Sequence, residues 1–427
     1  MKVPPVKGTR DFYPPQMAIR NYIVDGWKAA SLRNGFEEYD GPIFEYLKMY
    51  QIKSGDEIVE QLFNFTDRGD RKLAIRPEIT PTLARMVNQQ INSLPRPIKW
   101  FSVPRLCRAE RPQKGRLREF FQWNIDIIGI DDVLADAEVI FTAINYLQAT
   151  GLTADDIVVK ISSRKMLAAI LKEIGIKEKD LESIYTILDK RAKVPDDAFE
   201  EMLAEKISDA DIRQKVTQLM AAESIDSLSD IVSLSDKANE SVDELKKLFQ
   251  LLETMGVTDF CKFDITIVRG LAYYTGIVFE IYDKQSQLRA IGGGGRYDNL
   301  LKQFGGPQVS ATGFGIGDCV LGILLEEKGL LDGKENNRQI DYFVACADKQ
   351  FAKNALEITT KIRRAGFSAS FSYKATGLGK QLKQASAENA KKAIIIGEEF
   401  EKNQLAVKDL ESGDQTLVDI DKFFSQL

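Results

Sequence analysis

Hydrophobic and polar positions divide the chain into three stretches with different periodicity. Up to about residue 330, short apolar runs at strand spacing are mixed with a few helical patterns. Within this stretch, at about 165–250, glycine is sparse and apolar residues recur at helical spacing between Leu, Lys, Glu, Asp and Ala. After a polar linker at 331–339, strand-like and helical runs alternate over 340–427. The pattern predicts a first domain at 1–330 with a helical insertion, and a small α/β domain at 340–427.

Capping and turn residues predict the elements near the start of the chain. Apolar positions at helical spacing indicate a helix over 17–34, which ends at Gly35. Residues 62–87 are typical of a hairpin with a Gly-Asp turn, followed by a helix that starts near Thr80. Pro81 suits the first turn of that helix, because its missing N–H would have no partner there.

A basic loop joins two strand-like segments, 98–110 and 118–130, in a chain whose formal net charge is −5. An acidic protein can bind a polyanion only through such a local patch. Converging guanidinium groups suit phosphate oxygens, and the aromatic residues Phe120, Phe121 and Trp123 suit a stacked base. A run of charges can equally be a solvated hairpin face. The cations are Arg105, Arg108, Arg111, Lys114, Arg116 and Arg118, opposed by Glu110.

Three further motifs carry weaker signals. In "RPEIT", Glu78 and Thr80 would share one face if the segment is extended, and both could accept hydrogen bonds from an ammonium group, but Thr80 could also cap the following helix. Arg269 in "VRGLAYYTG" stands among apolar residues, so it should pair with a carboxylate or face a ligand. The four glycines at 292–295 allow close approach of a ligand or a backbone, although a bare turn fits them equally well.

The composition excludes several classes of site. The chain contains no histidine, which rules out Ser-His-Asp and Cys-His catalysis and histidine-ligated metals. Its four cysteines form no CxxC pair, so we expect reduced thiols in the cytoplasm and no metal held by a protein motif. No apolar run reaches the about 18 residues of a membrane span, and the first residues lack the apolar core of a secretory signal.

Taken together, these stretches resemble the histidyl-tRNA synthetases, a family of class II aminoacyl-tRNA synthetases. The resemblance runs from "KGTRDFYP" through "GPIFE", "RPEIT", "RAERPQKGRLREFFQ", "VRGLAYYTG" and "GGGGRYD" to "LGKQLK". It implies an α+β fold: a class II catalytic domain at 1–330, built on an antiparallel sheet flanked by helices with a helical insertion, and a C-terminal α/β anticodon-binding domain at 340–427. The stretch around Pro42 resembles class II motif 1, which implies a homodimer.

The implied activity is that of a histidine–tRNA ligase. ATP would activate L-histidine to histidyl-adenylate with release of pyrophosphate, and the histidine would then pass to the 3′ end of tRNA(His). The resemblance makes Arg108 and Arg269 the catalytic residues, which bind the α-phosphate and the histidine carboxylate. Glu110 would bind the adenine amino group and Phe120 would stack on the ring, with Mg²⁺ arriving with ATP. The tRNA-binding residues would be Arg111, Gln113, Lys114 and Arg116.

A further set of residues would hold the amino acid. Glu78, Thr80 and Gln122 match family positions that bind the α-ammonium group. Asp126 and Tyr274 match positions that read the imidazole, although Asp126 replaces a Glu that is common in bacterial members. The resemblance implies the remaining contacts with histidine from Tyr273 and Tyr297.

The main departure from the family lies in class II motif 3. The family usually ends a "GFxxGxxR" pattern with an arginine that binds ATP, whereas "GFGIGDCVL" has Val320 there, preceded by Asp318. Either another cation compensates or ATP binding differs. The departure leaves open a non-catalytic regulatory subunit of ATP-phosphoribosyltransferase, although the intact "RPQKGR" and the C-terminal domain favour a synthetase. A synthetase for another amino acid is a third reading, which "RGLAYYTG" disfavours.

Overall fold

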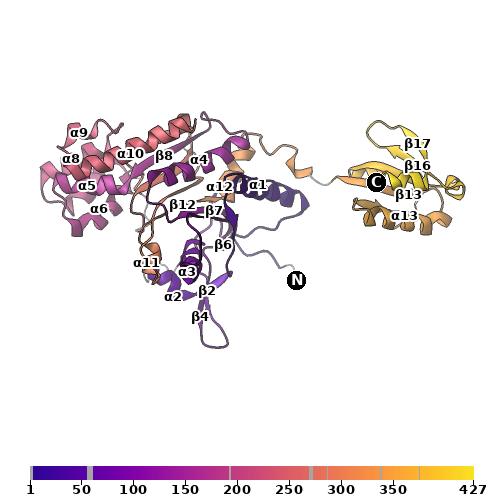
Figure 1. Cartoon of the computed structure of the whole chain (residues 1–427), viewed down its shortest axis with the longest axis horizontal. Coiled ribbons are helices and arrows are strands. Elements are labelled where there is room, and N and C mark those ends of the chain that lie inside the picture. Colours follow the sequence, from indigo (N-terminus) through magenta and orange to yellow (C-terminus); the bar gives the residue numbers. More distant parts are fainter. Residues whose placement is uncertain are drawn as a thin grey trace. The chain divides into compact units, whose positions relative to one another are not determined.

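The structure is a computed structural model of the chain. It describes residues 3–54, 61–191, 194–268, 273–285, 287–336, 339–374 and 376–427. The chain forms two compact units, Met1–Asp332 and Gly333–Leu427, both drawn in Figure 1.

A nine-stranded sheet, counted over the described residues, is the centre of the first unit. Its six central strands pair antiparallel, and a short strand joins in parallel at each edge, which confirms the antiparallel sheet expected from the family resemblance. An additional strand, β6 (Arg105–Cys107), pairs with β7 outside this path. The path runs β1 (Glu37–Glu38), β5 (Ile98–Ser102), β7 (Glu119–Ile128), β12 (Ala311–Gly317), β11 (Gly292–Arg296), β10 (Ile277–Asp283), β8 (Ile157–Ser163) and β9 (Cys261–Phe263).

Three helices cover one face of β7 and β12 (Figure 1): α1 (Pro14–Arg33), α4 (Val133–Ala149) and α12 (Asp318–Glu327). The Trp27 ring of α1 stacks on the Trp123 ring of β7 at 6.2 Å between centroids. The Trp123 indole N–H donates to Ser31 Oγ at 2.8 Å, so the buried polar atom of this large ring has a partner. These contacts fix which face of β7 enters the core.

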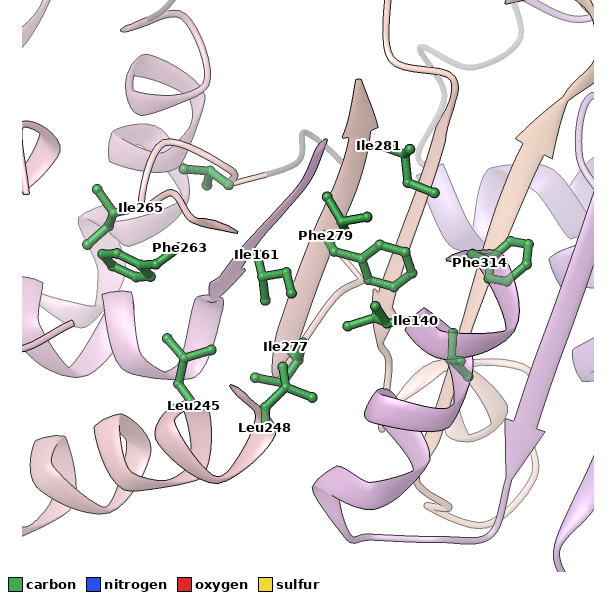
Figure 2. Close-up of a cluster of buried hydrophobic side chains, with 14 of the residues drawn as sticks. Ile140, Ile161, Leu245, Leu248, Phe263, Ile265, Ile277, Phe279, Ile281 and Phe314 are labelled. Carbon is green, nitrogen blue, oxygen red and sulfur yellow. The ribbon is translucent and has the colours of Figure 1, made fainter. Parts of the chain in front are cut away.

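The helical insertion packs against the same core. Leu245 and Leu248 of α10 point towards Ile161 of β8 and Ile277 of β10, and all four side chains are buried (Figure 2). Burial of each such side chain contributes about 1.5–3 kcal/mol. The insertion comprises α5 (Arg164–Ile174), η2 (Glu178–Asp180), α6 (Leu181–Leu188), α7 (Asp196–Ala204), α8 (Ala210–Met220), α9 (Leu228–Ile231) and α10 (Asp236–Thr254), and η4 (Thr258–Phe260) leads back to the sheet.

A smaller set of elements is held by two further apolar clusters, one of which packs on the opposite face of the sheet. The predicted hairpin is present, with Asp70 at φ 56° in its turn. The predicted helix begins at Thr80, but its N-cap is Ile79, so Thr80 neither caps the helix nor continues a strand from Glu78. The elements are β2 (Phe44–Tyr46), α2 (Leu47–Ser54), β3 (Asn64–Thr66), β4 (Lys72–Ile75), α3 (Thr80–Gln90) and α11 (Leu300–Gln303).

The second unit is a small α/β domain, as predicted. Its sheet has the order β14-β13-β15-β16-β17; the first three strands are parallel and the last two pairings antiparallel. After η5 (Lys334–Asn336), the elements are β13 (Ile340–Cys346), η6 (Lys349–Phe351), α13 (Ala352–Arg364), β14 (Ala369–Phe371), α14 (Leu378–Ala387), β15 (Ala390–Ile396), η7 (Glu398–Lys402), β16 (Gln404–Asp409), β17 (Gln415–Asp419) and α15 (Ile420–Ser425). In neither unit do the described residues include a helix that is both long and apolar enough to cross a membrane.

Candidate active site

The candidate site lies on the sheet face opposite α1, α4 and α12. Side chains alternate between the faces of a strand, so Trp123 of β7 enters the core while its neighbours Gln122 and Asn124 point the other way. Asp126, two residues further along, lies on the same outer face and is 4% exposed. One strand thus presents an amide pair and a buried carboxylate in a row.

Glycines on the neighbouring strands make room for this row. A Cβ at Gly313 of β12 would lie 2.2 Å from Asp126 Oδ1, and one at Gly315 would lie 2.8 Å from Gln122 Nε2. The four glycines at 292–295 form strand β11, so the bare turn that the sequence left open is wrong. A Cβ at Gly295 would lie 2.5 Å from the Ile277 carbonyl oxygen, which only glycine avoids.

Asp126 belongs to a polar and aromatic pocket. It accepts a hydrogen bond from the Tyr297 hydroxyl. Burial and the Asp126 charge raise the pKa of Tyr297 well above its ordinary value, so the phenol keeps its proton and continues to donate. Tyr273 packs edge-on against Tyr297 at 5.9 Å, and its hydroxyl lies 3.3 Å from that of Tyr274. The structure therefore brings together four of the residues expected to contact histidine.

Two pocket residues were missed by the sequence analysis. Trp100 of β5 lies opposite Asp126 in the strand register and packs against Tyr39 at 5.6 Å between ring centroids. The Tyr39 hydroxyl is buried, and no hydrogen-bond partner reaches it in the described part of the chain. Burial, and after it the Asp126 charge, raises the pKa of Tyr39. The alternation along 98–102 could have placed Trp100, whereas nothing local marks Tyr39.

The basic loop begins at the other end of β7. The Arg108 Nε donates to the Pro77 carbonyl oxygen at 3.1 Å, and its guanidinium lies over the Phe120 ring, 5.2 Å from the centroid. Arg108 therefore lies beside the segment that carries Glu78 and Thr80, both half-buried. A cation and an aromatic ring are held together where the sequence predicts a nucleotide.

The tip of this loop is a tight turn. Gln113 and Arg116 exchange two backbone hydrogen bonds of 2.9 Å each, and Gly115 takes a positive φ of 73° between them. Glu110 forms an ion pair with Arg116, and Lys114 forms an exposed one of 3.1 Å with Glu327 of α12. The side chains of Arg111, Gln113 and Lys114 are exposed, as a nucleic-acid contact requires.

Family models match both units of the chain. A family model for "Histidyl-tRNA synthetase" matches residues 8–317, and one for "Anticodon binding domain" matches residues 341–427. The chloroplastic/mitochondrial histidine–tRNA ligase of Arabidopsis thaliana is 41% identical over 97% of this chain and 84% of its own. The chain belongs to the histidyl-tRNA synthetase family.

Further members of the histidyl-tRNA synthetase family agree with this assignment. The histidine–tRNA ligase of Opitutus terrae is 40% identical over 96% of this chain and 94% of its own. The crystal structure of histidyl-tRNA synthetase from Nostoc sp. PCC 7120 superposes with a TM-score of 0.81 over 100% of this chain and 99% of that one, at 23% identity. The recognition and the fold class expected from the motifs are confirmed.

The structure explains the aspartate in motif 3, where this chain departs from the pattern of the histidyl-tRNA synthetases. Asp318 is buried and accepts hydrogen bonds from Arg10 at 2.6 Å and from the Phe121 backbone N–H at 3.0 Å. These bonds join the N-terminal segment, β7 and α12 at one carboxylate. Val320, at the place of the family arginine, packs under the loop turn: a Cβ on Gly115 would lie 3.0 Å from its Cγ2.

Arg269, the second expected catalytic residue, lies outside the described residues, as do the three residues after it. The preceding residues 264–268 are described and form no strand. A place for Arg269 beside Arg108 stays a prediction.

Proposed function

We propose that this chain is a histidine–tRNA ligase that forms histidyl-adenylate from L-histidine and ATP and then charges tRNA(His). The observation that supports this is the outer face of β7. Phe120, Gln122 and Asp126 share that face, and the six-residue step from Phe120 to Asp126 spans about 20 Å. This length suits a nucleotide at the Arg108 end, an amino acid head group in the middle and a side-chain pocket at the Asp126 end.

The first step needs no nucleophile from the protein. A carboxylate oxygen of histidine attacks the α-phosphorus of ATP, the new O–P bond forms, and the bond to the β-phosphate breaks as pyrophosphate leaves. Arg108, and Arg269 as expected from the resemblance, stabilise the charge that develops on the phosphoryl oxygens. The terminal ribose hydroxyl of the tRNA then attacks the acyl carbon, and AMP leaves. Catalysis consists of positioning and electrostatics.

Selection of histidine follows from the pocket around Asp126. The carboxylate accepts from one imidazole N–H, and the Tyr274 hydroxyl contacts the other ring nitrogen. The hydrogen bond from Tyr297 holds Asp126 in place. An apolar side chain of similar shape would leave these buried polar groups unpaired, which costs about 1–3 kcal/mol for each group. Gln122, together with Glu78 and Thr80, would bind the α-ammonium group.

ATP and tRNA approach from the loop side. Phe120 would stack on adenine, and Glu110 would accept from its amino group alongside the ion pair with Arg116. Mg²⁺ would arrive on the phosphate oxygens of ATP, since this hard cation prefers oxygen ligands and is usually bound together with substrate phosphates. Arg111, Gln113, Lys114 and Arg116 would contact the acceptor end of the tRNA. We also propose a homodimer formed through the stretch around Pro42, and a cytoplasmic location.

Histidine-dependent exchange of pyrophosphate into ATP tests this function. We expect exchange with L-histidine and none with the other standard amino acids. Absence of exchange with every amino acid would favour the regulatory subunit of ATP-phosphoribosyltransferase as the alternative. Exchange with a different amino acid alone would reassign the enzyme to another synthetase group.

A further inference from the structure

We propose that Arg289 is an ATP-binding residue of this site, which contacts the phosphates that leave as pyrophosphate. This inference rests on the proposed function, because it takes the ligand of the site to be ATP. Arg289 supplies the positive charge that is missing from motif 3, where Val320 stands in place of the family arginine.

The backbone brings Arg289 to the nucleotide end of the site. Arg289 lies in the connection between β10 and β11 and its side chain is exposed. Two residues later the chain rejoins the sheet: the Ile291 N–H donates to the Ile281 carbonyl at 2.8 Å, and the Gly317 N–H donates to the Ile291 carbonyl at 3.3 Å. Gly317 directly precedes Asp318, the first residue of α12, and pairs with Gln122 of β7. Sheet order thus places the 289–291 segment beside the start of α12.

The positive charges near Arg289 indicate that its ligand is an anion. Burial lowers the pKa of Arg116, and the positive charges of Arg289 and Arg108 lower it further, so both of these guanidinium groups lie close enough to act on Arg116. Glu110 pairs with Arg116, whereas no salt bridge joins Arg289 to a carboxylate in the part of the chain that the structure describes. Like charges repel at short range, and an anion placed among them removes that repulsion. A polyphosphate has the charge and the length for this position.

The position of Val320 explains why the cation comes from another strand connection. The buried valine side chain packs under Gly115 at the turn of the basic loop, where a Cβ on Gly115 would lie 3.0 Å from Val320 Cγ2 and 3.9 Å from Ile323 Cδ1. Its apolar side chain offers no positive charge to a phosphate. With Val320 under the loop turn, the connection between β10 and β11 supplies a guanidinium to the site through Arg289. Because Arg108 is expected at the α-phosphate, Arg289 would contact the β- and γ-phosphates.

The test compares Arg289→Ala with wild type in pyrophosphate exchange and in direct ATP binding by titration calorimetry. Loss of a charge-assisted contact predicts a rise of about 10-fold to 100-fold in the KM and Kd for ATP, with the KM for histidine unchanged. Arg289→Lys should restore part of the ATP affinity, since it keeps the charge but not the planar fork. Lys284→Ala, an exposed cation removed from the same connection, is the matched control and should behave as wild type.

Each outcome separates this inference from the proposed function. Wild-type exchange with histidine together with an unchanged KM for ATP in Arg289→Ala would overturn the role of Arg289 and leave the function intact. A rise in the KM for tRNA alone would also overturn it, because Arg289 would then contact polynucleotide phosphates. Absence of exchange in the wild type would reject the proposed function itself. In that case, the Kd for ATP of the wild type and of Arg289→Ala, compared by calorimetry, would still test the role of Arg289. Since Arg289 is exposed, its substitution should leave the thermal unfolding midpoint unchanged.

Discussion

Arg10 and Asp318, 308 residues apart in the sequence, form a salt bridge of 2.6 Å at the start of helix α12. The same carboxylate accepts the Phe121 backbone N–H, and the Gly8 carbonyl accepts the Arg118 N–H at 2.8 Å. The N-terminal segment therefore crosses the base of the basic loop and fastens it to α12. This arrangement gives the N-terminal segment around Arg10 a role in holding the Arg108 end of the candidate site.

Removal of Arg10 should weaken both the fold and the site. In Arg10→Ala, the buried Asp318 loses its cation, and we expect a loss of about 1–3 kcal/mol in the free energy of unfolding, measured by urea denaturation. Arg10 is 32% exposed, so this loss of stability should be smaller than that for a fully buried ion pair. Lys28→Ala, which breaks the exposed pair with Glu38, is the control and should cost less than about 1 kcal/mol. Equal losses in the two variants would contradict the special position of Asp318.

Substitutions around Asp126 should change histidine recognition without changing ATP binding. For Asp126→Ala we expect kcat/KM for histidine to fall by about 100-fold or more, since an imidazole N–H loses its acceptor in a buried pocket. For Tyr297→Phe we expect about a tenfold fall, because Asp126 then loses the donor that orients it. Pyrophosphate exchange at varied histidine and varied ATP measures both effects. A parallel rise in the KM for ATP would show that Asp126 acts on the whole site instead.

A single methyl group at Gly313 should disrupt the pocket. The added Cβ would lie 2.2 Å from Asp126 Oδ1 and 2.4 Å from the Ile125 carbonyl oxygen, and the latter atom belongs to the sheet backbone and cannot move aside. Gly313→Ala should therefore lower the unfolding midpoint and abolish histidine-dependent exchange. Gly322→Ala in α12 is the matched control: its nearest neighbour would be Ile23 at 4.0 Å, and alanine is the better helix former. Histidine-dependent exchange at the wild-type rate in Gly313→Ala would refute the close packing of Gly313 against Asp126.

The C-terminal unit should show a pH-dependent stability that depends on Asp341. Hydrogen bonds from Lys391 and Ser368 lower the pKa of Asp341 to about 2. A depressed folded pKa contributes stability above the unfolded value of about 3.9, and this contribution is lost as the pH falls towards 2. The midpoint of Asp341→Asn should thus lie below wild type at pH 7, and the difference should shrink between pH 5 and pH 3. The pair lies at the surface, with Asp341 28% and Lys391 52% exposed, so solvent screening keeps the effect under about 1 kcal/mol.

Exposed Glu401→Gln removes the same charge at a surface position and serves as the comparison for Asp341→Asn. Calorimetric scans of the full-length variants at several pH values give the midpoints. A difference between Asp341→Asn and wild type that stays constant down to pH 3 would show that the Lys391 contact is not formed in solution.

Local patterns in the sequence determined the elements and the family. The Gly-Asp turn, Pro81 and the apolar spacing of the insertion act over a few residues, and each of these predictions is confirmed in the structure. The motifs around Arg108 likewise identified the family and its fold, because the types and spacing of motif residues are themselves local properties. The glycine run at 292–295 allowed two readings, and only the tertiary structure decided between them: backbone atoms of neighbouring strands approach these glycines closely, and the bare turn is wrong.

Only the tertiary structure decided which distant residues meet. The strand order β1-β5-β7 sets Tyr39 near Asp126, and the order β7-β12-β11-β10 brings Arg289 close enough for its charge to act on Arg116. Packing of the N-terminal segment against α12 joins Arg10 to Asp318. No local periodicity encodes that order, because strand neighbours are selected by the packing of the whole sheet against its helices. The family and the fold were therefore readable from the motifs, whereas the proximity of Arg289 to Arg116 became visible only when separate strand connections converged.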